Sequence, residues 1–127
     1  MKRITLLVDD NAVQAATRKA ILERAGQRVA VATDGFEALS LLENPEILQR
    51  LGLIISDHLM PGMNGPELVR RIREAYSTIP ILILSGLPNA EEEYRGMNVV
   101  FRNKPFPPDA LISLSRELLD EPMSRTA

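Results

Sequence analysis

The sequence predicts an α/β fold in which helices cover both faces of an open, parallel β-sheet. Five short apolar runs, rich in Leu, Ile and Val, alternate with segments of helical pattern along the chain. Turn signals bound these runs, as is typical of buried parallel strands. Acidic residues, a serine and a lysine follow the ends of four of the runs. This alternation predicts a single sheet that is built by right-handed crossovers.

The first part of the chain contains two predicted strands and their helices. We expect strands over 3–8 and 28–32, and helices over 11–25 and 33–42. Asp10 or Asn11 caps the first helix, and Gly26 ends it. Asn44-Pro45 breaks the helical pattern, and we interpret 46–52 as a helix tail followed by a loop.

The second part alternates in the same way but contains one weak helix. We expect strands over 53–56, 81–84 and 99–102, and helices over 65–76, 90–95 and 107–119. The segment 90–95 is poorly patterned, which predicts a shortened fourth helix. Pro107-Pro108 starts the last helix. We expect one domain over 1–120 and a flexible tail over 121–127, where the apolar pattern stops.

Composition restricts the class of protein. The chain has 127 residues, 45% of them hydrophobic, and a net charge of -2, which suits a single globular domain. No apolar stretch is long enough to span a bilayer, and Lys2-Arg3 leads into a strand instead of a signal-peptide core. The absence of cysteine excludes disulfides and thiolate chemistry. We therefore expect a cytoplasmic protein without membrane insertion, and the charge gives no reason to expect direct nucleic-acid binding.

The order of the strands decides whether the charged residues meet. Five strands favour the flavodoxin-like order 2-1-3-4-5, in which the strands that end at Asp9-Asp10 and at Asp57 are neighbours. Ligands bind outside the carboxyl ends of such a sheet, where the strand order reverses. Three carboxylates that lie close together need a cation, and Mg2+ suits them because it prefers oxygen ligands.

These residue types suit phosphoryl transfer. Asp57 can attack phosphorus as a nucleophile and form an aspartyl phosphate. A metal and Lys104 can neutralise charge on the transferring oxygens, and Ser85 can hydrogen-bond one of them. Each residue also has a purely structural interpretation, because acidic residues cap helices and a serine after a strand often forms a turn. For Asp10 the roles of cap and metal ligand are compatible.

Four motifs carry a resemblance to a known family. They are Leu7-Val8-Asp9-Asp10-Asn11, Ser56-Asp57-His58-Leu59-Met60-Pro61-Gly62-Met63-Asn64-Gly65, Ile83-Leu84-Ser85-Gly86 and Lys104-Pro105-Phe106. Each motif alone is weak, but four of them in this order at strand ends are specific. Over about 3–119 the chain resembles the receiver domain of response regulators from two-component signalling, of the single-domain type.

The resemblance implies a role for each site residue. Asp57 would be the phosphoacceptor, and Ser85 and Lys104 would take the hydroxyl and lysine positions of the family. The implied metal ligands are Asp10 and Asp57 directly, Asp9 through water and Leu59 through its backbone carbonyl. A cis peptide bond would precede Pro105, as proline permits.

The resemblance also implies a switch and partners. The phosphodonor would be a sensor histidine kinase or a histidine phosphotransfer protein, and an unknown downstream protein would receive the signal or the phosphoryl group. Ser85 would move toward the phosphoryl group, and Phe101 would fill the space that it leaves. Kinase specificity would lie largely on the exposed face of the first helix, around Val13, Gln14, Thr17 and Arg18, and in the loop after Lys104. We assign no essential role to His58, the only histidine.

Receivers of this kind are signalling domains and not enzymes, although self-phosphorylation from small phosphodonors and autodephosphorylation are expected. The chain ends soon after its last helix, so we expect no attached output domain, unless these residues are a piece of a longer protein. The main alternative is a receiver-like interaction module that is not phosphorylated, but such modules typically lack an acidic residue or the lysine. A haloacid dehalogenase would need an aspartate two residues after its nucleophile, where Asn11 and Leu59 stand. Asp9-Asp10 would repel the phosphate of a flavin, and no glycine-rich P-loop is present.

Overall fold

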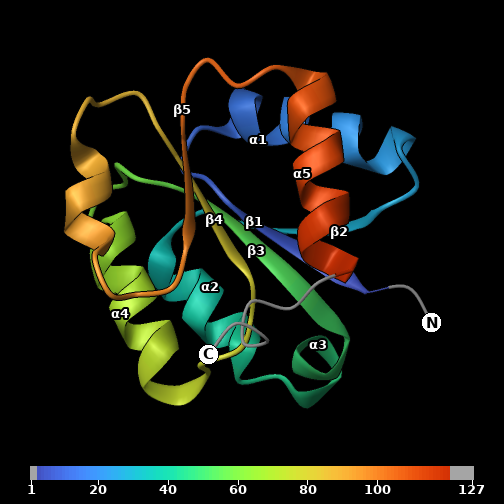
Figure 1. The fold of residues 1–127 in the computed structure, drawn as a ribbon. Helices are drawn as coiled ribbons and strands as arrows, with labels where there is room; N and C mark the ends of the chain where they lie inside the picture. The colour runs from blue at the N-terminus through green and yellow to red at the C-terminus, as the bar shows by residue number, and fades with distance from the viewer. Residues whose placement is uncertain (1–2, 121–127) are drawn as a thin grey trace.

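The computed structural model describes residues 3–120, and these form a five-stranded parallel sheet with helices on both faces (Figure 1). The strands are β1 (Ile4–Val8), β2 (Arg28–Ala32), β3 (Leu51–Asp57), β4 (Ile81–Ser85) and β5 (Val100–Asn103). Their order is β2-β1-β3-β4-β5, and every neighbouring pair is parallel. The predicted fold class and strand order are thus confirmed. The tail predicted over 121–127 lies outside the described residues.

The two faces of the sheet carry different helices. α1 (Ala12–Arg24) and α5 (Pro108–Asp120) pack on one face, whereas α2 (Gly35–Leu42), α4 (Gly65–Ala75) and a 3-10 helix, η1 (Ala90–Tyr94), pack on the other (Figure 1). Successive strand residues point to opposite faces, so Leu6 and Leu7 of β1 belong to different halves of the core. Burial on both faces explains why the strands are apolar throughout. Within residues 3–120 no helix is long and apolar enough to cross a bilayer.

Asparagine and aspartate side chains start four of the helices. The capping residues are Asn11 for α1, Asp34 for α2, Asn44 for α3 (Pro45–Arg50) and Asn64 for α4. Each side chain accepts a hydrogen bond from a backbone N–H of the first turn, which has no partner inside the helix. The cap at Asn11 starts α1 directly beyond the carboxyl end of β1, beside the two acidic residues that precede it.

The segment 46–52 differs from its prediction. The interpretation as a helix tail plus a loop is wrong, because α3 is a separate helix and β3 already begins at Leu51. Asn44 accepts a hydrogen bond from the Glu46 N–H at 2.9 Å and Pro45 occupies the first turn, so the chain starts a new helix here. Gly52 lets β3 lie close to the Leu119 and Arg3 side chains, because a Cβ at this position would lie 2.7 Å from Leu119 and 2.8 Å from Arg3.

The fourth crossover confirms the predicted shortening of its helix. Only η1 forms between β4 and β5. Asn89 precedes it in the left-handed conformation, at φ 66°, and Gly96 follows at φ 79°. These two conformations confine the helix to a short turn, which ends at the buried Tyr94.

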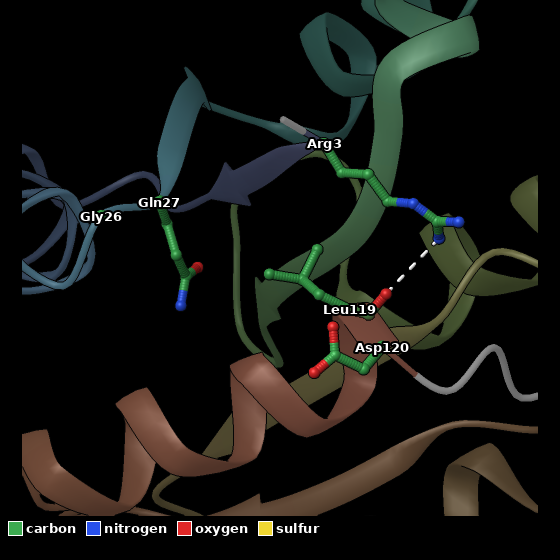
Figure 2. Close-up of a pocket in the computed structure, with 5 residues that line it drawn as sticks. All are labelled: Arg3, Gly26, Gln27, Leu119 and Asp120. Atoms are coloured by element: carbon green, nitrogen blue, oxygen red, sulfur yellow. Dashed lines mark hydrogen bonds between the residues drawn. The ribbon is translucent and has the colours of Figure 1, made fainter. Parts of the chain in front are cut away.

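The amino end of the sheet is closed by structural hydrogen bonds. Arg3 Nη1 donates to the Leu119 carbonyl at 3.5 Å and so links the start of β1 to the end of α5 (Figure 2). Gln27, which lines the same pocket, donates to the Ser115 hydroxyl at 2.7 Å. The charged residues that the sequence singled out lie at the opposite end of the strands.

Candidate functional site

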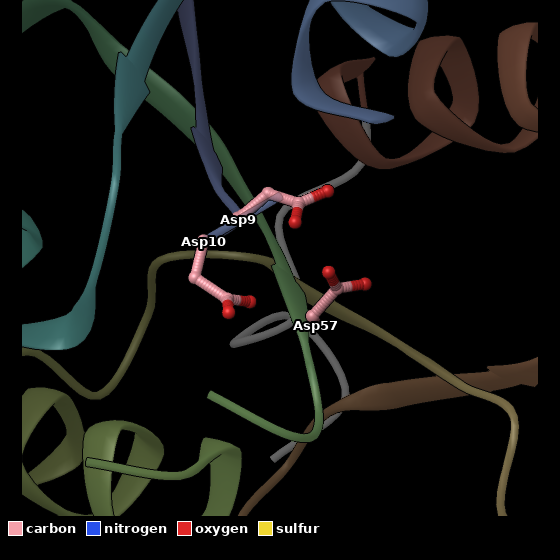
Figure 3. Close-up of side chains that lie close together, drawn as sticks. All are labelled: Asp9, Asp10 and Asp57. Atoms are coloured by element: carbon pink, nitrogen blue, oxygen red, sulfur yellow. The ribbon is translucent and has the colours of Figure 1, made fainter. Parts of the chain in front are cut away.

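Three carboxylates converge at the carboxyl ends of β1 and β3 (Figure 3). Asp9 and Asp10 directly follow β1, and Asp57 ends β3. β1 and β3 are neighbours in which Val8 is paired with Ser56, so the residues after them come together. One oxygen from each of the three carboxylates lies within 4.8 Å of the others. The predicted convergence is therefore present.

The donor set fits a hard divalent cation. All three ligand groups are carboxylates, and Mg2+ favours oxygen ligands while it retains several waters. Asp9 and Asp57 are buried, whereas Asp10 is exposed. The exposed side of the cluster gives bound waters room, and the buried side fixes two of the carboxylates.

Asp57 receives three hydrogen-bond donors from other elements. Lys104 Nζ lies 2.9 Å from Oδ1, and Arg18 Nη1 lies 3.0 Å from the same oxygen. The Gln14 amide Nε2 donates to Oδ2 at 2.9 Å. Both oxygens of this buried carboxylate are thus satisfied, and two cations compensate its charge.

Asp9 shares two of these partners. Its Oδ1 accepts from the Asn11 backbone N–H at 2.9 Å. Its Oδ2 accepts from Gln14 Nε2 at 2.8 Å and from Arg18 Nη1 at 3.2 Å. Gln14 and Arg18 therefore bridge Asp9 and Asp57.

The two buried carboxylates have opposite shifts of pKa. Burial and the neighbouring Asp57 raise the pKa of Asp9 to about 6. Burial opposes ionisation of Asp57 as well, but its bonds with Asp9 and Lys104 and the charge of Arg18 outweigh this and lower its pKa. Asp57 is therefore the carboxylate that stays ionised, as a nucleophile requires.

Lys104 reaches Asp57 because of the turn that follows β5. Its backbone N–H donates to the Ser85 carbonyl at 2.7 Å, and the Lys104–Pro105 peptide bond is cis, as expected. This turn directs the ammonium group across the end of β4 to the end of β3. The structure thus brings Lys104 to the carboxylates, where it forms an ion pair with Asp57.

The other predicted residues lie close to this end of the sheet but make different contacts. Ser85 ends β4, and its buried hydroxyl accepts the Leu87 N–H at 3.0 Å. Phe101 is 8% exposed and lies inward, with its ring centroid 5.8 Å from that of Tyr94. Leu59 is in the loop after β3, where its side chain is exposed. The roles that the sequence gave to these residues stay predictions.

Sequence reasoning misplaced two residues of the site. It assigned Gln14 and Arg18 to an exposed face of α1, yet both side chains turn inward to the carboxylates. Only Val13 and Thr17 of that set are exposed. The spacing of Gln14 and Arg18 could have indicated this, because residues four apart share a helix face. Gln14 also lies only three residues after Asn11, close to the acidic pair. A polar pair next to an acidic cluster indicates a site and not a docking surface.

Comparisons with known proteins agree with this geometry. The family model of the response regulator receiver domain matches residues 5–116. The chain is 34% identical over 122 residues to the aerobic respiration control protein ArcA of Escherichia coli, a match that covers 94% of this chain and 49% of ArcA. It is 32% identical over 118 residues to the C4-dicarboxylate transport transcriptional regulatory protein DctD of Pseudomonas aeruginosa, covering 91% and 25%. The chain thus spans about half or less of the length of these curated relatives.

Solved structures give the same result over whole chains. The chemotaxis protein CheY4 of Vibrio cholerae has a TM-score of 0.82 and 31% identity, covering 93% of this chain and 99% of CheY4. A CheY-like receiver domain protein from Methanospirillum hungatei has a TM-score of 0.87 and 25% identity, covering both chains completely. The chain therefore belongs to the response regulator receiver domains of two-component signalling.

Proposed function

We propose that this receiver domain accepts a phosphoryl group from a phosphohistidine donor onto Asp57, in a reaction that requires Mg2+. The contacts of Asp57 are the main support for this proposal. This buried carboxylate lies 2.9 Å from Lys104 Nζ and belongs to a cluster of three carboxylates whose oxygens lie within 4.8 Å. Receiver domains bind Mg2+ at such a cluster, which supports the same use here.

The transfer step is a displacement at phosphorus. One oxygen of the Asp57 carboxylate forms a bond to phosphorus while the bond from phosphorus to the donor's imidazole nitrogen breaks and its electron pair leaves with the nitrogen. The lowered pKa of Asp57 keeps this oxygen ionised. Lys104, whose Nζ lies 2.9 Å from Asp57 Oδ1, would stabilise negative charge on the transferring oxygens.

The residues proposed to hold Mg2+ are Asp10 and Asp57 directly, Asp9 through water and Leu59 through its backbone carbonyl. When bound, the metal neutralises charge on the phosphoryl oxygens. Asp9 already accepts hydrogen bonds from Asn11, Gln14 and Arg18, which is consistent with a contact to the ion through water.

The proposed switch uses Ser85 and Phe101. An aspartyl phosphate brings about two negative charges and new acceptor oxygens to the end of β3. We expect the Ser85 hydroxyl to leave the Leu87 N–H and donate to a phosphoryl oxygen, and the inward Phe101 to repack in response. The rearranged surface would then signal to a downstream protein or present the phosphoryl group for relay.

A cleft of about 550 Å³ between α1 and α5 supports a protein as the phosphodonor. Its apolar wall comes from Ile21, Phe106 and Leu111, and Arg18 and Lys104 stand at the end near Asp57. A histidine kinase or a histidine phosphotransfer protein would use such a wall to bring its imidazole to the carboxylate. We propose a cytoplasmic signalling domain over 1–120 in place of an enzyme, with self-phosphorylation from small phosphodonors and autodephosphorylation.

The test is the intact mass of the protein after incubation with acetyl phosphate, with and without Mg2+. We expect one added phosphoryl group that requires Mg2+ and is absent from Asp57→Asn. If no adduct forms, NMR spectra are recorded with Mg2+ and beryllofluoride, which imitates the phosphoryl group. Spectra that do not respond to beryllofluoride would exclude phosphotransfer and favour a receiver-like interaction module.

A further inference from the structure

Gln14 and Arg18 form a polar pair inside the site, and neither is among the residues proposed to hold the metal or to contact the phosphoryl oxygens. They lie one turn apart on α1, so their side chains leave the same face of the helix. Each bridges Asp9 and Asp57, through Gln14 Nε2 at 2.8 and 2.9 Å and through Arg18 Nη1 at 3.2 and 3.0 Å. The Arg18 side chain is only 12% exposed, so this contact is not a loose surface ion pair.

The pair is held by the elements around it. Asn11 caps α1 by accepting the Gln14 N–H at 2.9 Å, and the buried Leu22 anchors the same helix to the sheet. The Gln14 amide oxygen also faces Lys104 Nζ at 3.4 Å. This fixes the amide orientation, because the reverse one would place the carbonyl oxygen against two carboxylates. The bridging geometry is therefore built into the fold.

Arg18 contacts two of the three carboxylates of the candidate metal site. Its Nη1 binds Asp9 Oδ2 and Asp57 Oδ1, whereas the ion pair of Lys104 is with Asp57. Guanidinium is always charged and cannot be removed from the competition by losing a proton. Mg2+ that binds among Asp9, Asp10 and Asp57 must share these carboxylates with a fixed positive charge, which repels it.

We infer that Arg18 is a resident cation that competes with Mg2+ for Asp9 and Asp57 and thereby sets the metal affinity of the domain, while Gln14 holds the two carboxylates at bridging distance. Arg18 is thus a positioning residue for the metal site. The inference rests on the Mg2+ site of the proposed function.

The test is Mg2+ binding to the full chain, measured by isothermal titration calorimetry at fixed ionic strength. Arg18→Leu removes the charge, and we expect it to bind Mg2+ about tenfold more tightly than wild type. Arg18→Gln should show most of this gain, whereas Arg18→Lys, which keeps the charge, should stay closer to wild type. Gln14→Leu removes hydrogen bonds from an uncharged donor and should change the affinity less than Arg18→Leu does.

Arg24→Leu is the matched control, because it removes the same charge from an exposed position in the last turn of the same helix. Its affinity should stay within about twofold of wild type, since an exposed distant charge is screened. Circular dichroism establishes that each variant is folded. Equal or weaker binding by both Arg18→Leu and Arg18→Gln would overturn the inference while leaving the metal site intact. If neither wild type nor variants bind Mg2+, the proposed function fails as well.

Discussion

The hydroxyl oxygen of Tyr94 lies 2.6 Å from Nδ1 of His58, the residue that follows Asp57. Both side chains are buried, and Nε2 of His58 faces Glu93 at 3.3 Å. In a neutral imidazole with its proton on Nε2, Tyr94 donates to Nδ1 and Nε2 donates to Glu93. Tyr94 also packs against Phe101. A contiguous set of contacts therefore leads from the end of β3 through η1 to β5.

Tyr94→Phe tests the strength of this contact. Burial raises the pKa of Tyr94 above its ordinary value, so the hydroxyl keeps its proton and remains a donor at all working pH values. Its removal leaves a buried imidazole nitrogen without a partner, and we expect a loss of about 1–3 kcal/mol in the free energy of unfolding. Urea denaturation measures this loss. Tyr76→Phe, at a half-buried tyrosine, is the control and should cost less than about 0.5 kcal/mol.

Gly65→Ala should disturb the same contact from the other side. A Cβ at Gly65 would overlap the Tyr94 hydroxyl and lie 3.2 Å from the backbone of His58. We expect a destabilisation of about 1–3 kcal/mol in urea denaturation, because an overpacked core forces its neighbours to shift. The cost should shrink in the Gly65→Ala, Tyr94→Phe double variant. Gly86→Ala serves as the comparison, since a Cβ there would meet no atom within 4 Å; equal costs at the two glycines would refute the overlap.

The periodicity of the sequence predicted the five parallel strands, and their number favoured the strand order that the structure has. Strands buried on both faces produce continuous apolar runs, and the charged residues at their ends predicted the cluster of carboxylates that the structure shows. The segment 46–52 was misread because a six-residue helix carries too little pattern, and only the capping residue Asn44 marked its start. The starting point of β3 depended on tertiary packing of Gly52 against Leu119, which local sequence does not encode.

The sequence predicted that the three carboxylates and Lys104 lie close together, with Mg2+ and Lys104 as the neutralising cations. It did not predict that Gln14 and Arg18 bridge Asp9 and Asp57. A polar residue on a helix is usually taken to face solvent, and the sequence alone does not give its distance to the carboxylates. Gln14 and Arg18 were therefore assigned to the exposed surface of α1. His58 is a second residue whose contacts the sequence did not predict. Nothing in its local sequence specified the buried contact with Tyr94, which lies 36 residues further along the chain.

Asp9→Asn should change the dependence of stability on pH. The pKa of Asp9 is raised from 3.8 to about 6, so the folded protein keeps a proton that the unfolded chain releases. The stability from this proton is fully present below pH 3.8 and is lost as the pH rises through 6. Asp9→Asn lacks this loss, so relative to wild type it should gain about 1–2 kcal/mol between pH 4.5 and pH 8.

The measurement is urea denaturation of both proteins without Mg2+ at pH 4.5, 6 and 8. Asp57 has a lowered pKa, so its own contribution changes at lower pH than this window. Asp34→Asn would be a poor comparison because Asp34 caps α2. Glu23→Gln, at an exposed position of α1, is the better one and should show no such trend. A stability difference that is constant across the window would contradict the raised pKa of Asp9.

Asp10→Asn should separate metal binding from folding. Asp10 is the exposed member of the carboxylate cluster, and within residues 3–120 the cluster places its oxygen within 4.8 Å of the other two ligands. Without Mg2+ we expect the stability to change by less than about 0.5 kcal/mol, as for other surface sites. Wild type should gain about 2.7 kcal/mol at a Mg2+ concentration of 100 times Kd, because only the folded chain holds the ligands together. Asp10→Asn should lose most of this gain at the same concentration, and thermal unfolding with and without Mg2+ measures it. A full gain in Asp10→Asn would show that Asp10 is not a direct ligand and would leave Asp9 and Asp57 as the carboxylates that hold the ion.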